Sequence, residues 1–252
     1  MSNTSILIQV GQQRFSEKEA LVQFVKDDRV NTFLNDLAVY PHAYVLACCM
    51  DRQTKSELAW MIPWRIKELL GSFEMGFLAS VSLTEYKKVF SDNNLHRFKD
   101  TMAEVFYNAV QRIHTQYSDD ASKIWSDKPS SATVVYRFLQ FDGVGIKIAT
   151  MATNILARQF KVPLSDYYSI DVSPDIHVHR VMSRMGLINP NASNEEIIYK
   201  AREMYPQFPG IIDFSLWEIG RQWCRPENPD CTNCVVASEC MYNSCINKKQ
   251  TK

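Results

Sequence analysis

Apolar residues recur at helical spacing along most of the chain. Between 97 and 117 an apolar stripe of this spacing predicts a long amphipathic helix. Two Ser-x-x-Glu sequences, at 16–19 and 82–85, have the form of a capping box and predict helix starts. Pro63 is expected to kink or break its helix. The pattern predicts helices at about 16–39, 43–51, 55–70, 97–117, 131–140, 146–159, 175–185, 194–204 and 212–222, and a short one after 82–85. Because no segment alternates like a strand, we expect an all-α fold.

Composition and charge indicate a globular protein but do not identify its partner. The chain has 252 residues, enough for one or two compact lobes, and its 46% hydrophobic and 22% charged residues are ordinary for a globular protein. No apolar stretch approaches the roughly 18 residues of a membrane span, and no signal peptide is recognisable. We therefore expect a cytoplasmic protein, or a nuclear one in a eukaryote. Basic and acidic residues are balanced at 28 each, so net charge gives no sign of a nucleic-acid partner.

The first chemically informative segment joins two predicted helices through a glycine-containing turn. Gly143, Val144 and Gly145 allow a tight turn in which the apolar residue anchors the turn in the core. The backbone N–H groups that open the second helix are then free for a phosphate oxygen, although the same pattern also describes a plain helix corner. Lys147 follows among apolar residues, where partial desolvation would favour a nucleophilic amine; a lysine whose charge reaches solvent is the alternative.

An aspartate at a helix start is the second informative feature. Asp175 is a plausible N-cap, where backbone N–H groups and the helix dipole stabilise its anionic form. A fixed anion of this kind stabilises a developing cationic sugar. Simple capping is the alternative role, and Asp171 is the rival acid. His177 and His179 face different sides of the helix, so we interpret them as packing or surface residues.

Cysteines gather near the end of the chain. Five of the seven lie between 224 and 245, and four of them have the spacing Cys-x6-Cys-x2-Cys-x5-Cys. Four such thiolates suit a [4Fe–4S] cluster or zinc. The expected ligands are Cys224, Cys231, Cys234 and Cys240. Cys245 is left over, and Cys48 and Cys49 are expected in the helical core as small apolar side chains.

Together these segments resemble the endonuclease III branch of the helix-hairpin-helix DNA glycosylases. The family hairpin Leu-Pro-Gly-Val-Gly-Arg-Lys-Thr-Ala corresponds to FDGVGIKIA at 141–149, which places the family lysine on Lys147. The family sequence Val-Asp-Thr-His-Val-x-Arg-Val corresponds to PDIHVHRV, which places the catalytic aspartate on Asp175. The cysteine spacing matches without a gap and follows Gly220-Arg221, and MDRQT at 50–54 is similar to the Met-Leu-Gln-Gln-Thr of adenine-specific relatives.

The resemblance implies a fold, a cofactor and a site. It implies two helical lobes with a DNA cleft between them: a six-helix barrel at 42–158 with the hairpin at about 131–159, and a cluster domain of 1–41 and 159–252 with a [4Fe–4S] loop at 224–240. DNA contacts are expected from Arg52, Gln53, Gly143, Val144 and Gly145. The chain departs from the family pattern in three places: Asp142 replaces the family proline, a lengthened loop separates Lys147 from Asp175, and the cluster loop RPENPD is acidic. These departures bear on which substrate is recognised and on the affinity for DNA.

The implied activity is removal of a damaged or modified base from double-stranded DNA by a monomer. Asp175 would support loss of the base and help to deprotonate Lys147, and Lys147 would attack C1′. The resulting Schiff base would allow abasic-site (AP) lyase cleavage of the strand. The cluster would shape a DNA-contacting loop. One alternative is a monofunctional glycosylase that uses Asp175 and water, and another is a non-catalytic iron–sulfur DNA-binding protein. The sequence does not identify the base.

Overall fold

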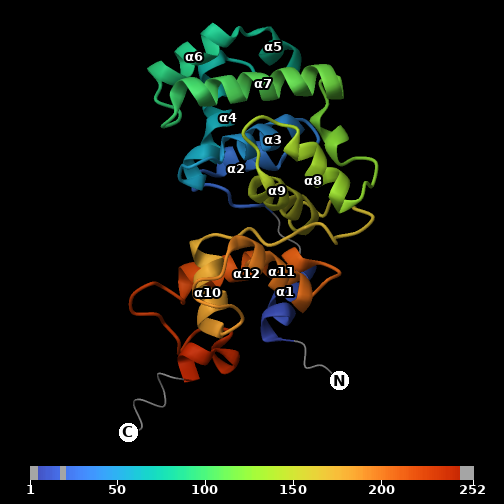
Figure 1. Cartoon of the computed structure of the whole chain (residues 1–252). Coiled ribbons are helices and arrows are strands. Elements are labelled where there is room, and N and C mark those ends of the chain that lie inside the picture. The colour runs from blue at the N-terminus through green and yellow to red at the C-terminus, as the bar shows by residue number, and fades with distance from the viewer. Residues whose placement is uncertain (1–4, 18–20, 245–252) are drawn as a thin grey trace. The chain divides into compact units, whose positions relative to one another are not determined.

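The structure, a computed structural model, describes residues 5–17 and 21–244. These residues form helices and loops without a β-strand, which confirms the all-α class. They form two compact units, one of residues 21–165 and one of residues 5–17 and 166–244 (Figure 1). The domain limits expected from the family resemblance, at 41/42 and 158/159, stay a prediction. No helix of the described residues is long and apolar enough to cross a bilayer.

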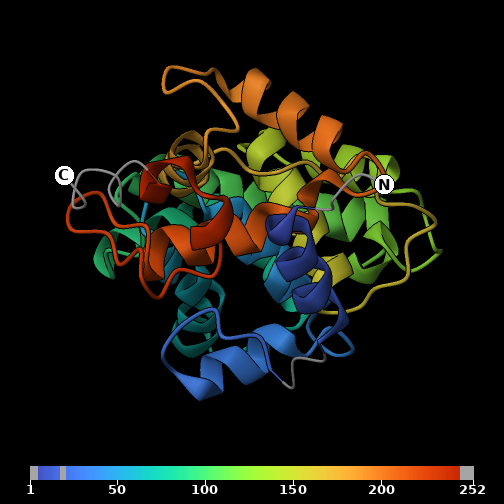
Figure 2. The same cartoon turned by 90° about the horizontal axis from the view of Figure 1, so that it is seen from below.

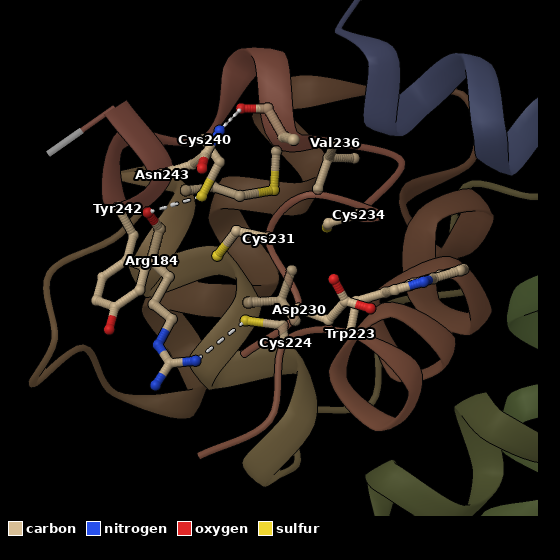
Figure 3. Close-up of a pocket in the computed structure, with 13 residues that line it drawn as sticks. Arg184, Trp223, Cys224, Asp230, Cys231, Cys234, Val236, Cys240, Tyr242 and Asn243 are labelled. Atoms are coloured by element: carbon tan, nitrogen blue, oxygen red, sulfur yellow. Dashed lines mark hydrogen bonds between the residues drawn. The ribbon is translucent and has the colours of Figure 1, made fainter. Parts of the chain in front are cut away.

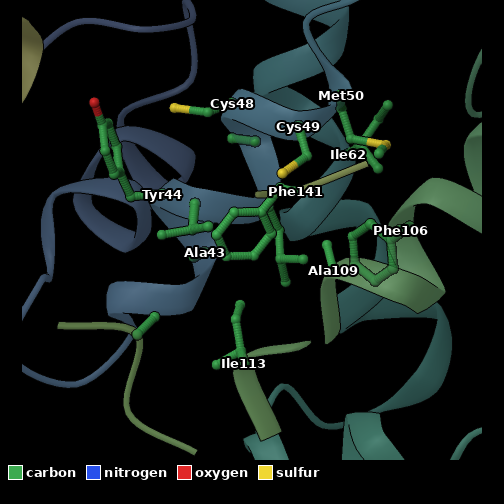
Figure 4. Packing of buried hydrophobic residues seen from close by; sticks show 14 of the residues in the cluster. Ala43, Tyr44, Cys48, Cys49, Met50, Ile62, Phe106, Ala109, Ile113 and Phe141 are labelled. Atoms are coloured by element: carbon green, nitrogen blue, oxygen red, sulfur yellow. The ribbon is translucent and has the colours of Figure 1, made fainter. Parts of the chain in front are cut away.

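The larger unit is built around one buried helix. All ten residues of α3 (Pro41–Met50) are buried, which explains why this helix is apolar on every side. Helix α3 contacts several of its neighbours, namely α2 (Asp28–Asn35), α4 (Ser56–Leu70), α7 (Lys99–Tyr117), α9 (Ile146–Arg158) and the 3-10 helix η1 (Ala121–Ile124). Figure 4 shows Cys49 and Met50 of this helix among apolar side chains of the core. Cys48 and Cys49 are fully buried, as expected.

The remaining helices of the larger unit pack on α7 and α9. They are α5 (Met75–Ser80), α6 (Leu83–Asp92) and α8 (Ser131–Leu139). Helices α5 and α6 pack on α7, and α8 packs on α9. The start of α6 is confirmed, because the Ser82 hydroxyl accepts the N–H of Glu85 at 3.2 Å. Pro63 lies inside α4 without ending it.

The smaller unit brings the first helix beside the last third of the chain. It contains α1 (Ile6–Ser16), α10 (Ile176–Met185), α11 (Asn194–Met204), α12 (Asp213–Gln222) and the 3-10 helices η2 (Pro209–Ile212) and η3 (Ala237–Glu239). Helix α1 lies beside α12 (Figures 1 and 2) and also contacts η2. A Cβ on Gly11 would lie 2.5 Å from the carbonyl oxygen of Ile211, so this approach requires glycine.

The prediction for residues 16–39 is wrong. Ser16 ends a helix that begins at Ile6, and Glu17 is the C-cap of that helix. Residues 18 and 19 of the supposed capping box lie outside the described residues. The next helix begins only after Asp27, whose side chain accepts the N–H of Arg29 at 3.0 Å. The side-chain oxygen of Asn31 accepts the N–H groups of Phe24 and Val25, both at 3.0 Å, and holds this segment as a loop. A local asparagine-based turn therefore replaces the expected helix.

Candidate functional site

The hairpin turn connects α8 to α9 and is anchored by apolar residues. Phe141 is buried, and its ring is parallel to that of Tyr117, with centroids 6.4 Å apart. Val144 is buried as expected, and its N–H donates to the carbonyl of Phe141 at 3.1 Å. Of the two turn glycines, only Gly143 has a positive φ, of 77°. Gly145 has an ordinary extended backbone as the N-cap of α9, so the positive φ of this turn lies at Gly143.

Helix α9 begins without a side-chain cap. Gly145 supplies no hydroxyl or carboxylate, and the first N–H groups of any α-helix lack partners within the helix. Gly145, Ile146 and Lys147 are all exposed at this end. The start of α9 is therefore accessible to an anion such as a phosphate oxygen. The phosphate contact itself stays a prediction.

Lys147 lies in the first turn of α9 and is exposed. Its apolar neighbours divide between the two sides of the helix, since Ile148 is buried and Ile146 is 52% exposed. The expectation that apolar neighbours desolvate Lys147 is therefore wrong for the chain in the absence of DNA. The reason is that helical neighbours in sequence point in different directions, and only some of them face the core.

Asp142 is the acid that replaces the family proline in the turn. It is exposed, and one carboxylate oxygen accepts a hydrogen bond from the side-chain amide of Asn108 at 2.8 Å. Asn108 belongs to α7, so the acid fastens the turn to a neighbouring helix. This bond gives Asp142 a structural role that a proline could not have.

The segment that follows α3 lies beside the hairpin turn. A Cβ placed on Gly143 would be 3.6 Å from a guanidinium nitrogen of Arg52. Gln53 has a positive φ of 50°, and its carbonyl accepts a hydrogen bond from Arg97 at 3.3 Å. Arg52 and Gln53 are exposed. The structure thus brings Arg52 close to Gly143 of the hairpin, while the roles of Arg52 and Gln53 on DNA stay a prediction.

Asp51 precedes these residues, and sequence reasoning did not single it out. Burial raises the pKa of its carboxyl group, and the ammonium of Lys147 acts in the opposite direction. The two side chains are therefore close enough to interact electrostatically. No local pattern reveals this, because the pair depends on how α3 packs on α9.

In the smaller unit, Asp175 is the N-cap of α10. One of its carboxylate oxygens accepts the N–H groups of His177 and Val178, both at 2.8 Å. Among the described residues, no hydrogen bond reaches its second oxygen. The predicted cap is confirmed, and the second oxygen is left available for another contact.

The rival acid has a different partner. Asp171 is 5% exposed and accepts two hydrogen bonds from the guanidinium of Arg202, at 2.7 and 2.8 Å. Both of its oxygens are occupied by this ion pair, which joins the long loop to α11. The geometry therefore favours Asp175 over Asp171 as an acid with a free oxygen.

Helix α10 is joined to α12 through a close contact and one arginine. A Cβ on Gly220 would lie 2.7 Å from the Cβ of His177. The guanidinium of Arg180 donates to the carbonyl of Gly220 at 2.9 Å and to that of Cys224 at 2.7 Å. His177 and His179 are half-buried, in agreement with a packing role. The matched glycine and arginine of the family motifs thus fix the start of the cysteine loop against α10.

Four cysteines line one pocket of the smaller unit, together with Arg184 (Figure 3). They are the expected Cys224, Cys231, Cys234 and Cys240. Burial raises the pKa of the Cys231 and Cys234 thiols, and the charges of the other cysteines raise it further. Thiolates this close repel one another, and a bound metal would offset that repulsion. The donor set therefore fits a soft metal or an iron–sulfur cluster. Within the described ranges, however, no three Cys, His, Asp or Glu side chains are arranged to hold one ion. Cys245 lies outside those ranges.

Arg184 binds both ends of the cysteine loop. Its guanidinium donates to the carbonyls of Arg225 and Pro226 at 2.6 and 2.8 Å and lies 3.5 Å from the sulfur of Cys224. The thiol of Cys240 donates to the Arg184 carbonyl at 3.4 Å. Sequence reasoning missed this residue, because its role depends on contacts with a loop some forty positions away.

Comparisons with known proteins agree with this architecture. Over 105 residues the chain is 31% identical to endonuclease III of Thermotoga maritima, which corresponds to 41% of this chain and 44% of that protein. The chain therefore matches less than half the length of this curated relative. No family model matches the chain.

Solved structures match nearly the whole chain. A trapped endonuclease III–DNA covalent intermediate has a TM-score of 0.57 at 18% identity and covers 89% of this chain and 98% of its own. A non-covalent endonuclease III–DNA complex has a TM-score of 0.58 at 19% identity, covering 89% and 95%. The chain has the helix-hairpin-helix DNA glycosylase fold. A thermostable thymine-DNA glycosylase agrees, with a TM-score of 0.60 at 14% identity and 95% of both chains covered.

This helix-hairpin-helix fold confirms the expected fold class. It also explains why the residues of the three sequence motifs fall on helix ends. Lys147 lies in the first turn of α9, Asp175 caps α10, and the first cysteine follows directly after α12. Identities below 20% in the solved structures show the fold and leave the chemistry to be argued from these residues.

Proposed function

We propose that the chain is a base-excision-repair DNA N-glycosylase that also cleaves abasic sites. The main support for this proposal is the position of Lys147. It is exposed in the first turn of a helix that has no side-chain cap, directly after a glycine turn, in a helix-hairpin-helix glycosylase fold. An uncapped helix start holds a phosphate through backbone N–H groups, which requires no excess of basic side chains. This reasoning agrees with the balanced charge of the chain.

In the proposed reaction, the enzyme extrudes a damaged nucleotide from the duplex. The Nζ atom of Lys147 bonds to C1′ while the bond from C1′ to the base breaks, and the departing base takes a proton. The free oxygen of Asp175 stabilises positive charge at C1′. Opening of the sugar then gives a Schiff base, and loss of a proton from C2′ expels the 3′ phosphate.

The test uses duplexes that each carry a single lesion, with oxidised pyrimidines, alkylated bases, mismatches and phage-type modified bases in the set. Wild type is expected to release at least one of these bases, to nick the strand and to form a borohydride-trapped adduct. Lys147→Gln removes trapping and nicking. Lys88→Gln, which changes an exposed lysine of α6, is the matched control and keeps both. Absence of base release and of trapping on every duplex would refute the proposal.

A monofunctional glycosylase is the second candidate, and the exposure of Lys147 favours it. A nucleophilic lysine is typically activated by apolar surroundings, and Lys147 lacks them because it is exposed. In this case Asp175 would act with water at C1′. Base release without nicking or trapping, unchanged in Lys147→Gln and lost in Asp175→Asn, would identify it.

We further propose that Cys224, Cys231, Cys234 and Cys240 hold a [4Fe–4S] cluster. When bound, the cluster would stabilise the loop between its ligands and take no part in breaking the glycosidic bond. Purified protein is expected to be brown and to contain iron. Cys231→Ser lowers the iron content, and Cys48→Ala, which changes a buried cysteine of α3, leaves it unchanged. Zinc without iron would contradict this proposal.

A further inference from the structure

Helices α3 and α9 pack in opposite directions, and two contacts define their alignment. The Tyr44 hydroxyl on α3 donates to the carbonyl of Ala152 on α9 at 2.7 Å. Eight residues further along the chain, Arg52 lies over Gly143, which precedes α9. As the chain advances from 44 to 52 it therefore faces residues from 152 back to 143. This alignment places Asp51 near the first turn of α9, where Lys147 lies.

Asp51 is an acid in an unfavourable place. It is the C-cap of α3, where the helix dipole is negative and disfavours an anion. The side chain is half-buried, and among the described residues no hydrogen bond reaches its carboxylate. Its backbone N–H, by contrast, is satisfied by the carbonyl of Cys48 at 3.1 Å. Neither a helix-capping bond nor a hydrogen-bonded ion pair explains why an acid occupies this position.

Several titratable groups lie around Asp51, among them its neighbour Arg52 and the buried His96, whose ring bonds to the backbone of Met50 and Arg52. Lys147 on α9 is the cation that acts on the carboxyl group, and the buried thiol of Cys48 on α3 is a further titratable group coupled to it. Burial raises the pKa of Asp51 above its usual value. A carboxylate with a raised pKa is a stronger base, and its proton affinity approaches that of an amine more closely.

We propose that Asp51 is a positioning residue for Lys147: its carboxylate orients the ammonium group and accepts its proton, which leaves the free amine that attacks C1′. The inference rests on the proposed function. The step is balanced, since one proton moves from Nζ to a carboxylate oxygen, giving a neutral lysine and a neutral aspartic acid. The acid releases the proton to solvent after the product leaves.

The first experiment tests the pair without any activity. The carboxyl ¹³C signal of Asp51 is followed by NMR as a function of pH in the full-length protein. Lys147→Gln removes the cation and is expected to raise the pKa of Asp51, whereas Lys147→Arg keeps the charge and is expected to preserve it. Asp51 itself is unchanged in both variants. An Asp51 titration that is the same in wild type and Lys147→Gln overturns the proposal.

The second experiment tests proton acceptance. Single-turnover borohydride trapping is measured on abasic duplex DNA across a range of pH. Asp51→Asn is expected to slow trapping at neutral pH by at least about tenfold, with the affinity for the duplex unchanged. The deficit is expected to shrink at high pH, where solvent supplies the free amine, and Asp51→Glu restores part of the rate.

The outcomes separate the two proposals. An unchanged or faster rate in Asp51→Asn overturns the role of Asp51, because a mere counterion would only hold the lysine in its charged form. A wild-type protein that forms no trapped adduct refutes the lyase function and, with it, proton acceptance by Asp51. In that case the NMR titration still decides whether the two side chains form a pair.

Discussion

Separate replacement of Asp171 and Asp175 by asparagine distinguishes the structural acid from the proposed catalytic one. The Asp171 side chain is 6% exposed, while that of its partner Arg202 is 41% exposed. Breaking a buried ion pair costs about 3–5 kcal/mol, and an exposed one at most about 1 kcal/mol. With one buried and one half-exposed partner, Asp171→Asn is expected to lower the free energy of unfolding by about 1–3 kcal/mol. The folded Asp171→Asn variant is expected to release the base at the wild-type rate.

Asp175→Asn is expected to behave in the opposite way. Asparagine is as good an N-cap as aspartate, so the bonds to the N–H groups of His177 and Val178 survive. Stability is expected to stay within about 0.5 kcal/mol of wild type. Loss of the negative charge near C1′ is expected to lower the single-turnover rate by about 10²–10³-fold.

Urea unfolding measures the stability of each variant, and single-turnover base release measures its rate. Release is assayed well below the denaturing urea range, so that both variants are folded. The reasoning is refuted if Asp171→Asn is as stable as wild type but inactive, or if Asp175→Asn retains the wild-type rate. Asp92→Asn, which changes an exposed acid at the end of α6, is the control for both measurements.

Two further predictions concern packing and pH. Gly220→Ala places a Cβ 2.7 Å from that of His177, whereas the Cβ added by Gly76→Ala has open space. Gly220→Ala is therefore expected to destabilise the protein by about 1–3 kcal/mol relative to Gly76→Ala. Equal unfolding midpoints of the two variants would contradict this. Burial lowers the pKa of His42, whose Nε2 lies 2.7 Å from the Phe73 carbonyl oxygen. As pH falls below about 6.5, the histidine of the unfolded chain binds a proton that the folded chain does not bind. Protonation then favours the unfolded chain, so the free energy of unfolding decreases with falling pH. In His42→Gln the fall in urea midpoint between neutral and mildly acidic pH is expected to be smaller, and an identical fall would contradict the assignment.

Features set by neighbours in sequence were predictable. Asp175 was expected to cap α10 because a cap depends only on its own helix, and the start of α6 at Ser82 followed from the same local rule. Cys48 and Cys49 were likewise expected in the helical core, and both are buried. The local rule failed at Ser16, where the asparagine-based loop around Asn31 competes with helix formation.

Features set by packing were not predictable. The apolar residues around Lys147 suggested a desolvated amine, but only part of them face the core, and the lysine is exposed. Asp51 carries no recognisable motif, and its importance follows from the antiparallel packing of α3 on α9. The same holds for Arg184, whose contacts with the cysteine loop depend on the path of that loop.

The residues proposed for chemistry lie at helix ends, and this position assigns different work to the two acids. Asp175 lies at the start of α10, where the helix dipole is positive, and one of its oxygens accepts two backbone N–H bonds. Asp51 lies at the negative end of α3 without a hydrogen bond to its carboxylate among the described residues, and burial raises its pKa. The two helix ends therefore suit the roles proposed for the two acids, a fixed anion at Asp175 and proton acceptance at Asp51. Since helix ends supply these fields, the reaction needs no net positive charge on the protein, and the balance of 28 basic and 28 acidic residues is compatible with DNA as the substrate.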